Sequence, residues 1–157
     1  MGGSLRQLLV VIDEAYSEIS WHGPNLRGSI RGLTPREAAW RPGRKRHNIH
    51  EIVVHAAYWK YVVRRKLRGD RRGSFTLKGS NWFVRPSREP GASWEADLAL
   101  LESEHRLLRE TISALKESAL PLKPPGGRVK RERLIRGVAL HDVYHAGQIR
   151  LIRRLLP

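Results

Sequence analysis

Residues 131–155 carry an apolar stripe at helical spacing, and two histidines lie inside it. At about 100° per residue from Leu134, the residues Val138, His141 and His145 fall within about 40° of one direction. The segment is therefore predicted to form a helix whose histidines point at a buried core. Burying a bare imidazole costs free energy, so this pair needs either hydrogen-bond partners or a metal ion. A single pair four residues apart leaves both interpretations open.

Three other segments also place apolar residues at helical spacing, namely residues 5–20, 49–67 and 94–118. Stretches rich in glycine and proline separate the four segments, and no internal repeat appears along the chain. Four amphipathic helices bury their apolar faces most simply against one another. We therefore predict an all-α helix bundle made of one domain, residues 1–157.

Several residue patterns predict where helices begin. Thr34-Pro35-Arg36-Glu37 has the form of a capping box and should start one or two helical turns. Asn48 and Ser93 are predicted to cap the second and third long helices. Pro24 can begin a short helical piece, because proline is tolerated in a first turn.

The chain has 157 residues, with 30 Lys and Arg against 15 Asp and Glu, so its formal net charge is +15. A charge this high favours polyanionic partners such as nucleic acid. An arginine-rich composition without such a function explains it as well, because the charges are spread along the chain. Only residues 64–72 and 41–47 are densely basic.

The sequence contains no cysteine, which excludes disulfides, thiolate metal ligands and cysteine nucleophiles. The first residues lack the pattern of a signal peptide, and no apolar run reaches the roughly 18 residues of a membrane span. We therefore expect a cytoplasmic protein with no membrane association.

The second long helix offers a further candidate ligand. His55 and Trp59 flank the apolar stripe of that helix, at about 80° and 40° from its centre. His55 can therefore reach a ligand inside the bundle, and Glu51, one turn earlier, can accept its second N–H. His50 falls on the opposite side and is expected to be exposed. His47 precedes the helix and is not expected to be a ligand.

Residues 69–93 are irregular, and a connection of this length is usually either disordered or functional. Phe75-Thr76-Leu77 can pair briefly as a strand. The apolar cluster Asn81-Trp82-Phe83 favours an ordered segment folded back over the bundle. It is interpreted either as a lid at the mouth of the bundle or as an aromatic plug that closes the core.

The histidines His55, His141 and His145 come from two helices predicted to face each other and can fill three metal positions. A catalytic zinc site uses three protein ligands and keeps a fourth position open. Zinc, nickel, manganese or iron(II) suit nitrogen ligands without thiolates. His105 lies on the stripe of the third helix, where a core histidine is favoured over a fourth ligand.

The spacing differs from the His-Glu-x-x-His pattern of metal peptidases, since Asp142 follows His141. Any chemistry would come from the metal and its bound water or thiol. Tyr144, Glu51 and Asp142 are candidate acid/base groups, although no catalytic residue is assigned. Gln148 lies on the turn after His145, beside the histidine line.

Four segments resemble motifs of the DinB/YfiT-like family: Gly137 to Ile149, Asn48 to Trp59, Gly32 to Pro42, and Lys78 to Phe83. The resemblance extends over nearly the whole chain. The resemblance implies an antiparallel four-helix bundle with a long ordered loop between its second and third helices. It also implies a divalent metal, zinc or nickel above all, held by His55, His141 and His145, and often a homodimer. Five residues are then expected around the ion or its pocket, namely Glu51, Trp59, Trp82, Tyr144 and Gln148.

The function of that family is less uniform than its fold. Some members are similar to S-transferases that use a low-molecular-weight thiol, or to a mycothiol-dependent isomerase. Others are described as metal-dependent hydrolases. The resemblance therefore implies a metal-dependent enzyme acting on a small molecule, with thiol transfer favoured over hydrolysis and over a non-catalytic basic module that binds nucleic acid.

Overall fold

The computed structural model describes residues 3–86 and 88–157. Within these ranges it contains helices and no strand, which confirms the predicted all-α fold and excludes a strand at Phe75–Leu77. The helices are α1 (Gly3–Tyr16), α2 (Leu26–Ile30), α3 (Pro35–Ala39), α4 (Ile49–Arg68), α5 (Gly91–Ser113), the 3₁₀ helix η1 (Glu117–Ala119) and α6 (Arg131–Arg154). None of the described helices is both long and apolar enough to cross a membrane.

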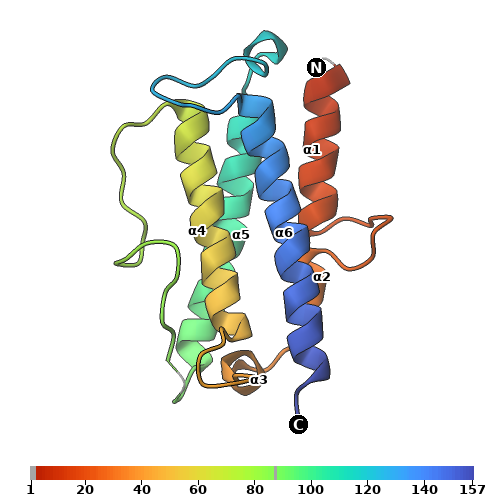
Figure 1. Cartoon of the computed structure of the whole chain (residues 1–157), viewed down its shortest axis with the longest axis vertical. Helices are drawn as coiled ribbons and strands as arrows, with labels where there is room; N and C mark the ends of the chain where they lie inside the picture. The colour runs from red at the N-terminus through yellow and green to blue at the C-terminus, as the bar shows by residue number, and fades with distance from the viewer. Residues whose placement is uncertain (1–2, 87) are drawn as a thin grey trace.

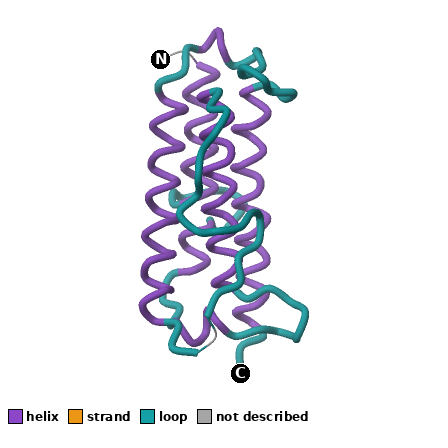
Figure 2. Tube along the Cα trace, turned by 90° about the vertical axis from the view of Figure 1, so that its left-hand side faces the viewer, coloured by secondary structure: helices purple, strands orange, loops and turns teal. Residues whose placement is uncertain are grey.

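The four long helices α1, α4, α5 and α6 lie side by side along the long axis of the molecule (Figure 1). Helices α1 and α6 run in one direction, and α4 and α5 run in the other. Consecutive helices α4 and α5 are parallel because the connection between them returns along the bundle before α5 begins (Figure 2). As a result, α4 packs antiparallel to α6, the helix that carries His141 and His145.

The helix starts follow the predicted caps in two of three cases. Thr34 forms a complete capping box with Glu37, and the side chain of Asn48 accepts the backbone N–H of Glu51. The predicted cap at Ser93 is wrong, because α5 begins two residues earlier at Gly91. The Ser93 hydroxyl instead donates to the carbonyl of Pro90, so this serine lies inside the first turn.

Helix ends depart further from the periodic patterns. Helix α1 ends at Tyr16 rather than residue 20, and α5 ends at Ser113 rather than residue 118. Apolar spacing continues past both ends, yet the backbone turns away to begin the next connection. Helix α2 begins at Leu26 rather than at Pro24, and the side chain of Asn25 caps it by accepting the Gly28 N–H.

A polar layer crosses the middle of the bundle and divides the apolar core into two clusters. On α4, one cluster includes residues up to Ala57 and the other begins at Val63. Between them the fully buried Lys60 forms an ion pair with Asp142 of α6. His105 of α5 stacks on Tyr16, and Nζ of Lys60 lies 4.9 Å from the centroid of the same Tyr16 ring, so His105 belongs to this layer.

The expectation of an exposed His50 is wrong, because its side chain is completely buried. Its Nε2 lies 2.7 Å from Oδ2 of Asp97 on α5, and the Nε–H of Arg85 donates to the same oxygen over 2.6 Å. Helix α4 packs against both α5 and α6, so two of its faces are buried rather than one. Arg85 also ties the long connection to α5.

His105 is a core histidine, stacked on the ring of Tyr16 at 3.7 Å between centroids. Burial lowers the pKa of its imidazole to about 3, whereas an unfolded chain has a histidine pKa of about 6.5. Between these values the unfolded chain binds one more proton. The free energy of unfolding therefore decreases as the pH falls from about 6.5 toward about 3.

The variant His105→Phe keeps a ring against Tyr16 and removes this proton. We expect its free energy of unfolding to depend less steeply on pH, by up to about 1.4 kcal/mol per pH unit. Urea unfolding of metal-free protein at several pH values measures the slope. His22→Phe, at an exposed position, is the control and should keep the original slope. Equal slopes in all three proteins would contradict the prediction.

Candidate metal centre

Three imidazoles from two helices converge between α4 and α6. The Nε2 of His141 lies 3.1 Å from Nε2 of His55 and 3.0 Å from Nε2 of His145. Neighbouring nitrogen ligands of a tetrahedral zinc ion are about 3.3 Å apart, given Zn–N bonds near 2.05 Å. Two of the three nitrogen–nitrogen distances are therefore close to the spacing that one ion requires. The ligand atoms of the three histidines all lie within 4.8 Å of one another, and the described residues contain no other such group.

The far sides of two rings are held by oxygen acceptors. Nδ1 of His55 is 2.7 Å from the backbone oxygen of Asn81, and Nδ1 of His145 is 2.7 Å from Oε1 of Gln148. Each Nδ1 therefore carries the proton and donates it, which directs the Nε2 lone pairs of His55 and His145 toward Nε2 of His141. This outer support is typical of metal-binding histidines.

Burial keeps these rings neutral. It lowers the pKa of His141 to about 3 and that of His145 to about 4, and it lowers the pKa of His55 as well. Only a neutral imidazole can donate its Nε2 lone pair to a metal. The site therefore presents three nitrogen donors at neutral pH without displacing protons, and the residues present fit a divalent ion.

The connection after α4 fixes the orientation of His55. Trp82 stacks on His55 with 3.8 Å between ring centroids. His47 stacks on the other face of Trp82, with 3.6 Å between their centroids. Asn81 has a φ of 64°, a left-handed conformation that asparagine tolerates, and its side-chain oxygen accepts the Trp59 indole N–H over 3.0 Å. Residues 81 and 82 thus form a clasp on the His55 ring.

Glu51 does not serve as the partner of His55. Its carboxylate pairs with Arg41 and lies 3.0 Å from Nδ1 of His47, and Asn81 takes the place expected for Glu51. Arg41 and His47 together lower the pKa of Glu51 against the opposing effect of burial. The carboxylate is therefore an ion-pair partner at the start of α4.

Of the three acid/base candidates, only Tyr144 is accessible at the site. It is 62% exposed, and its hydroxyl accepts the Nε2–H of Gln148 over 3.0 Å. Asp142 is buried and paired with Lys60, while Glu51 is buried and paired with Arg41. Neither carboxylate can reach a substrate beside the histidines.

Sequence reasoning missed two residues that hold the site. The sequence analysis treats Asn81 only as the first residue of the cluster Asn81-Trp82-Phe83. No neighbouring residue indicates that its backbone carbonyl contacts the ring of His55, 26 positions earlier in the chain. The sequence analysis assigns no role to Lys60, although it is fully buried against Asp142. A lysine in the middle of a helix that is otherwise largely apolar is a signal that could have found it.

The fold and the site define an all-α protein with a three-histidine group able to hold a metal ion. A family model described as the DinB superfamily matches residues 18–149, which include all three histidines. The chain therefore belongs to the DinB superfamily, as the sequence motifs indicate. Neither the curated proteins nor the solved structures contain a significant match to the chain.

Loss of an outer partner should weaken metal binding without removing a ligand. In the variant Gln148→Leu, Nδ1 of His145 loses its acceptor, and we expect zinc affinity to fall by about 10- to 100-fold. Competition with a chelator of known affinity measures the change. The matched control is Gln7→Leu, which makes the same substitution at an exposed position of α1. An unchanged affinity in Gln148→Leu would show that this hydrogen bond does not support the site.

Proposed function

We propose that this chain is a metal-dependent enzyme that transfers a small thiol to an electrophilic substrate. One observation carries the proposal: the ligand nitrogens of three neutral imidazoles converge within 4.8 Å of one another, and the two pairs that include His141 are 3.1 and 3.0 Å apart. His55, His141 and His145 would hold zinc or nickel, with manganese or iron(II) as alternatives. A divalent ion bound there would ionise a thiol or a water molecule at neutral pH.

A groove beside the histidines supports an anionic small-molecule substrate. It has a volume of about 600 Å³ and shares Trp82 and Gln148 with the surroundings of the metal centre. Lys45 and Arg46 line one side, and Leu151 belongs to the apolar part of its wall. Cationic side chains next to apolar ones suit a small organic acid, including an acidic thiol.

The residues around the centre have distinct roles in this proposal. Trp82 and Asn81 hold the His55 ring and keep one side of it away from water. Gln148 orients His145 and also binds the hydroxyl of Tyr144. Tyr144 does not line the groove itself, but it is exposed and bonded to Gln148, which does, and in this proposal it would exchange a proton with the substrate. Hydrolysis remains the alternative reaction, with water in place of the thiol.

Metal content tests the binding site. Protein produced without an affinity tag and loaded with zinc or nickel should retain about one ion per chain after removal of excess metal. His141→Ala should retain almost none, whereas His22→Ala, at an exposed position, should behave like the unchanged chain. Circular dichroism of each variant verifies that the helices are intact. Equal metal content in a folded His141→Ala would refute the site.

The reaction is tested with a panel of low-molecular-weight thiols and a chloroarene as the electrophile. In this reaction the thiol sulfur forms a bond to carbon, chloride leaves, and the thiol proton passes to solvent. We expect product formation that needs both the metal-loaded protein and a thiol, and that His141→Ala abolishes. Metal-dependent cleavage of ester substrates without any thiol would favour the hydrolase, and no turnover in either assay would contradict an enzyme of these classes.

A further inference from the structure

Most of the net charge comes from two segments far apart in the sequence. Residues 64–73 and 121–136 contain twelve of the 30 Lys and Arg but only two of the 15 Asp and Glu. They therefore contribute +10 of the formal charge of +15. The sequence alone identifies only the first of these as a dense basic run, because the second is interrupted by apolar residues, prolines and glycines.

The fold brings both segments to the same end of the bundle. The connection between α5 and α6 reaches across this end to the last turn of α4 (Figure 1). The two meet closely: a Cβ on Gly69 would lie 3.1 Å from Cδ of Pro125. A pocket of about 590 Å³ forms between them, and the residues that line it include the basic residues Lys66, Arg71 and Arg128 and the acidic Asp70, which is paired with Arg68.

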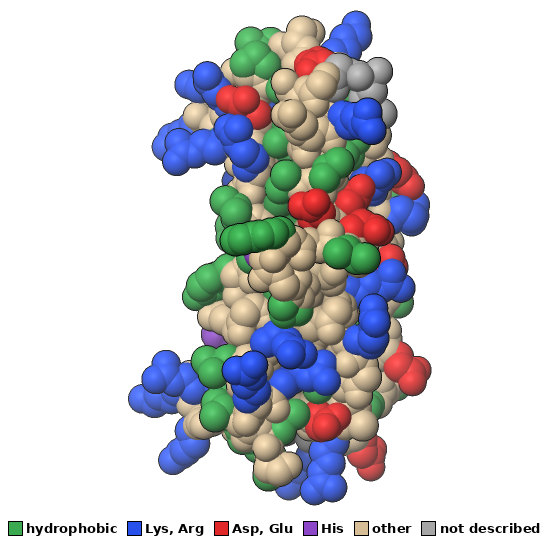
Figure 3. All heavy atoms as spheres, turned by 90° about the vertical axis from the view of Figure 1, so that its right-hand side faces the viewer, with side chains coloured by type: hydrophobic (Ala, Val, Ile, Leu, Met, Phe, Trp, Pro, Cys, Tyr) green, Lys and Arg blue, Asp and Glu red, His purple; other side chains and the backbone are tan. Residues whose placement is uncertain are grey.

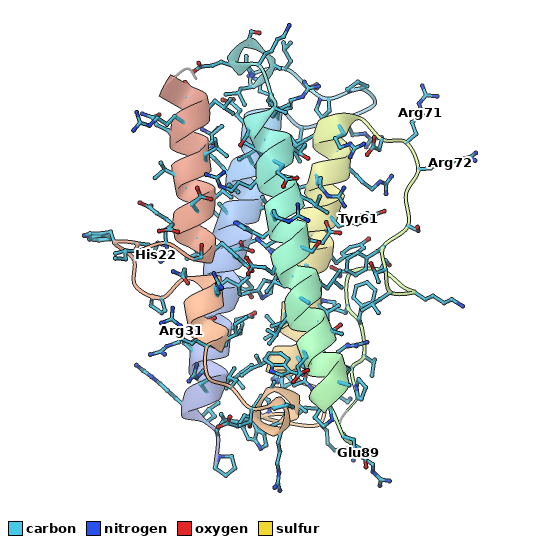
Figure 4. The ribbon with its side chains drawn as sticks, turned by 180° about the vertical axis from the view of Figure 1, so that it is seen from behind. His22, Arg31, Tyr61, Arg71, Arg72 and Glu89 are labelled. Atoms are coloured by element: carbon cyan, nitrogen blue, oxygen red, sulfur yellow. The ribbon has the colours of Figure 1, made fainter. Side chains whose placement is uncertain are left out.

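Five of the twelve basic residues have structural partners. Arg64, Arg68 and Arg136 pair with carboxylates, while Arg65 and Arg131 donate to backbone carbonyls. The other seven are exposed, and in the described part of the chain they form neither an ion pair nor a side-chain hydrogen bond. We call them the basic end: Lys66, Arg71, Arg72, Lys123, Arg128, Lys130 and Arg133. Arg71 and Arg72 project away from the helices (Figure 4).

Helix stability does not account for the cations at the start of α6. The first turn of a helix is the positive end of its dipole, where basic residues are unfavourable. Lys130 is nevertheless the N-cap residue and makes no capping hydrogen bond, and Arg133 follows within the first turn. Lys66, by contrast, lies in the last turn of α4, where a cation is favourable.

We infer that the basic end binds the phosphate backbone of a nucleic acid. Cations on two converging connections border a concave pocket. A nucleic-acid strand can enter such a pocket, whereas a flat bilayer cannot. The metal centre is separate, since Arg133 and His141 are eight residues, or about 12 Å, apart along α6. The inference therefore does not depend on metal binding or on thiol transfer.

The other end of the molecule is also basic, and Figure 3 shows Lys and Arg side chains gathered at both ends of one face. Its dense run, residues 41–47, differs in its surroundings. Arg41 is paired with Glu51, and Lys45 and Arg46 line the groove beside the metal centre. This second basic region provides a matched control for the first.

Fluorescence anisotropy with labelled DNA duplexes and single-stranded RNA tests the inference on the full chain. We expect affinity to fall steeply between about 50 mM and about 200 mM salt. The double variant Arg71→Glu/Arg128→Glu should weaken binding by about tenfold or more and reduce the logarithmic salt slope by about 2. The double variant Arg36→Glu/Arg44→Glu has the same formal net charge, +11, but its two substitutions lie at the opposite end of the bundle. It should bind nucleic acid almost as well as the unchanged chain.

Three results would overturn the inference. The first is no binding to either nucleic acid at low salt. The second is equal weakening by the two double variants, which would mean that only net charge matters. The third is binding to vesicles that contain phosphatidylserine without binding to nucleic acid, which would identify a membrane surface instead. Circular dichroism of both variants verifies that their helices are intact.

Discussion

The buried ion pair between Lys60 and Asp142 joins α4 to α6 in the polar layer at the middle of the bundle. Removing one partner of such a pair leaves an uncompensated buried charge, which typically costs about 3–5 kcal/mol. The two helices are therefore held in one register along their length. Asp142 follows His141 directly, so the register that satisfies the ion pair also brings His141 opposite His55.

The three-histidine group is consequently supported from two directions. The ion pair sets the distance between the helices from inside the bundle, and the clasp of Asn81 and Trp82 sets the ring of His55 from outside. The parallel arrangement of α4 and α5 makes the second support possible, because the connection between them must travel along the bundle past the histidines. The crossover connection is thus part of the candidate metal centre.

How far the sequence predicts each feature depends on whether its cause is local. Helix α4 was predicted at residues 49–67 and spans Ile49–Arg68, because Asn48 caps its start and Gly69 adopts the left-handed conformation that ends it. His50 was assigned to the wrong environment because a single apolar stripe does not show that a second helix covers the opposite face. The partner of His55 was missed for a similar reason: Asn81 reaches it from a distant connection.

The same distinction between local and distant causes applies to the basic end. A run of basic residues is visible in the sequence, but the meeting of residues 64–73 with 121–136 depends on how two connections fold over one end of the bundle. The sequence by itself determined the presence of the four long helices, the caps at Thr34 and Asn48, and the three histidines, since helical periodicity and capping act over a few residues. Only the tertiary structure decided the helix directions, the partners of those histidines and the shared basic pocket. These depend on contacts between residues far apart in the chain, which no local pattern encodes.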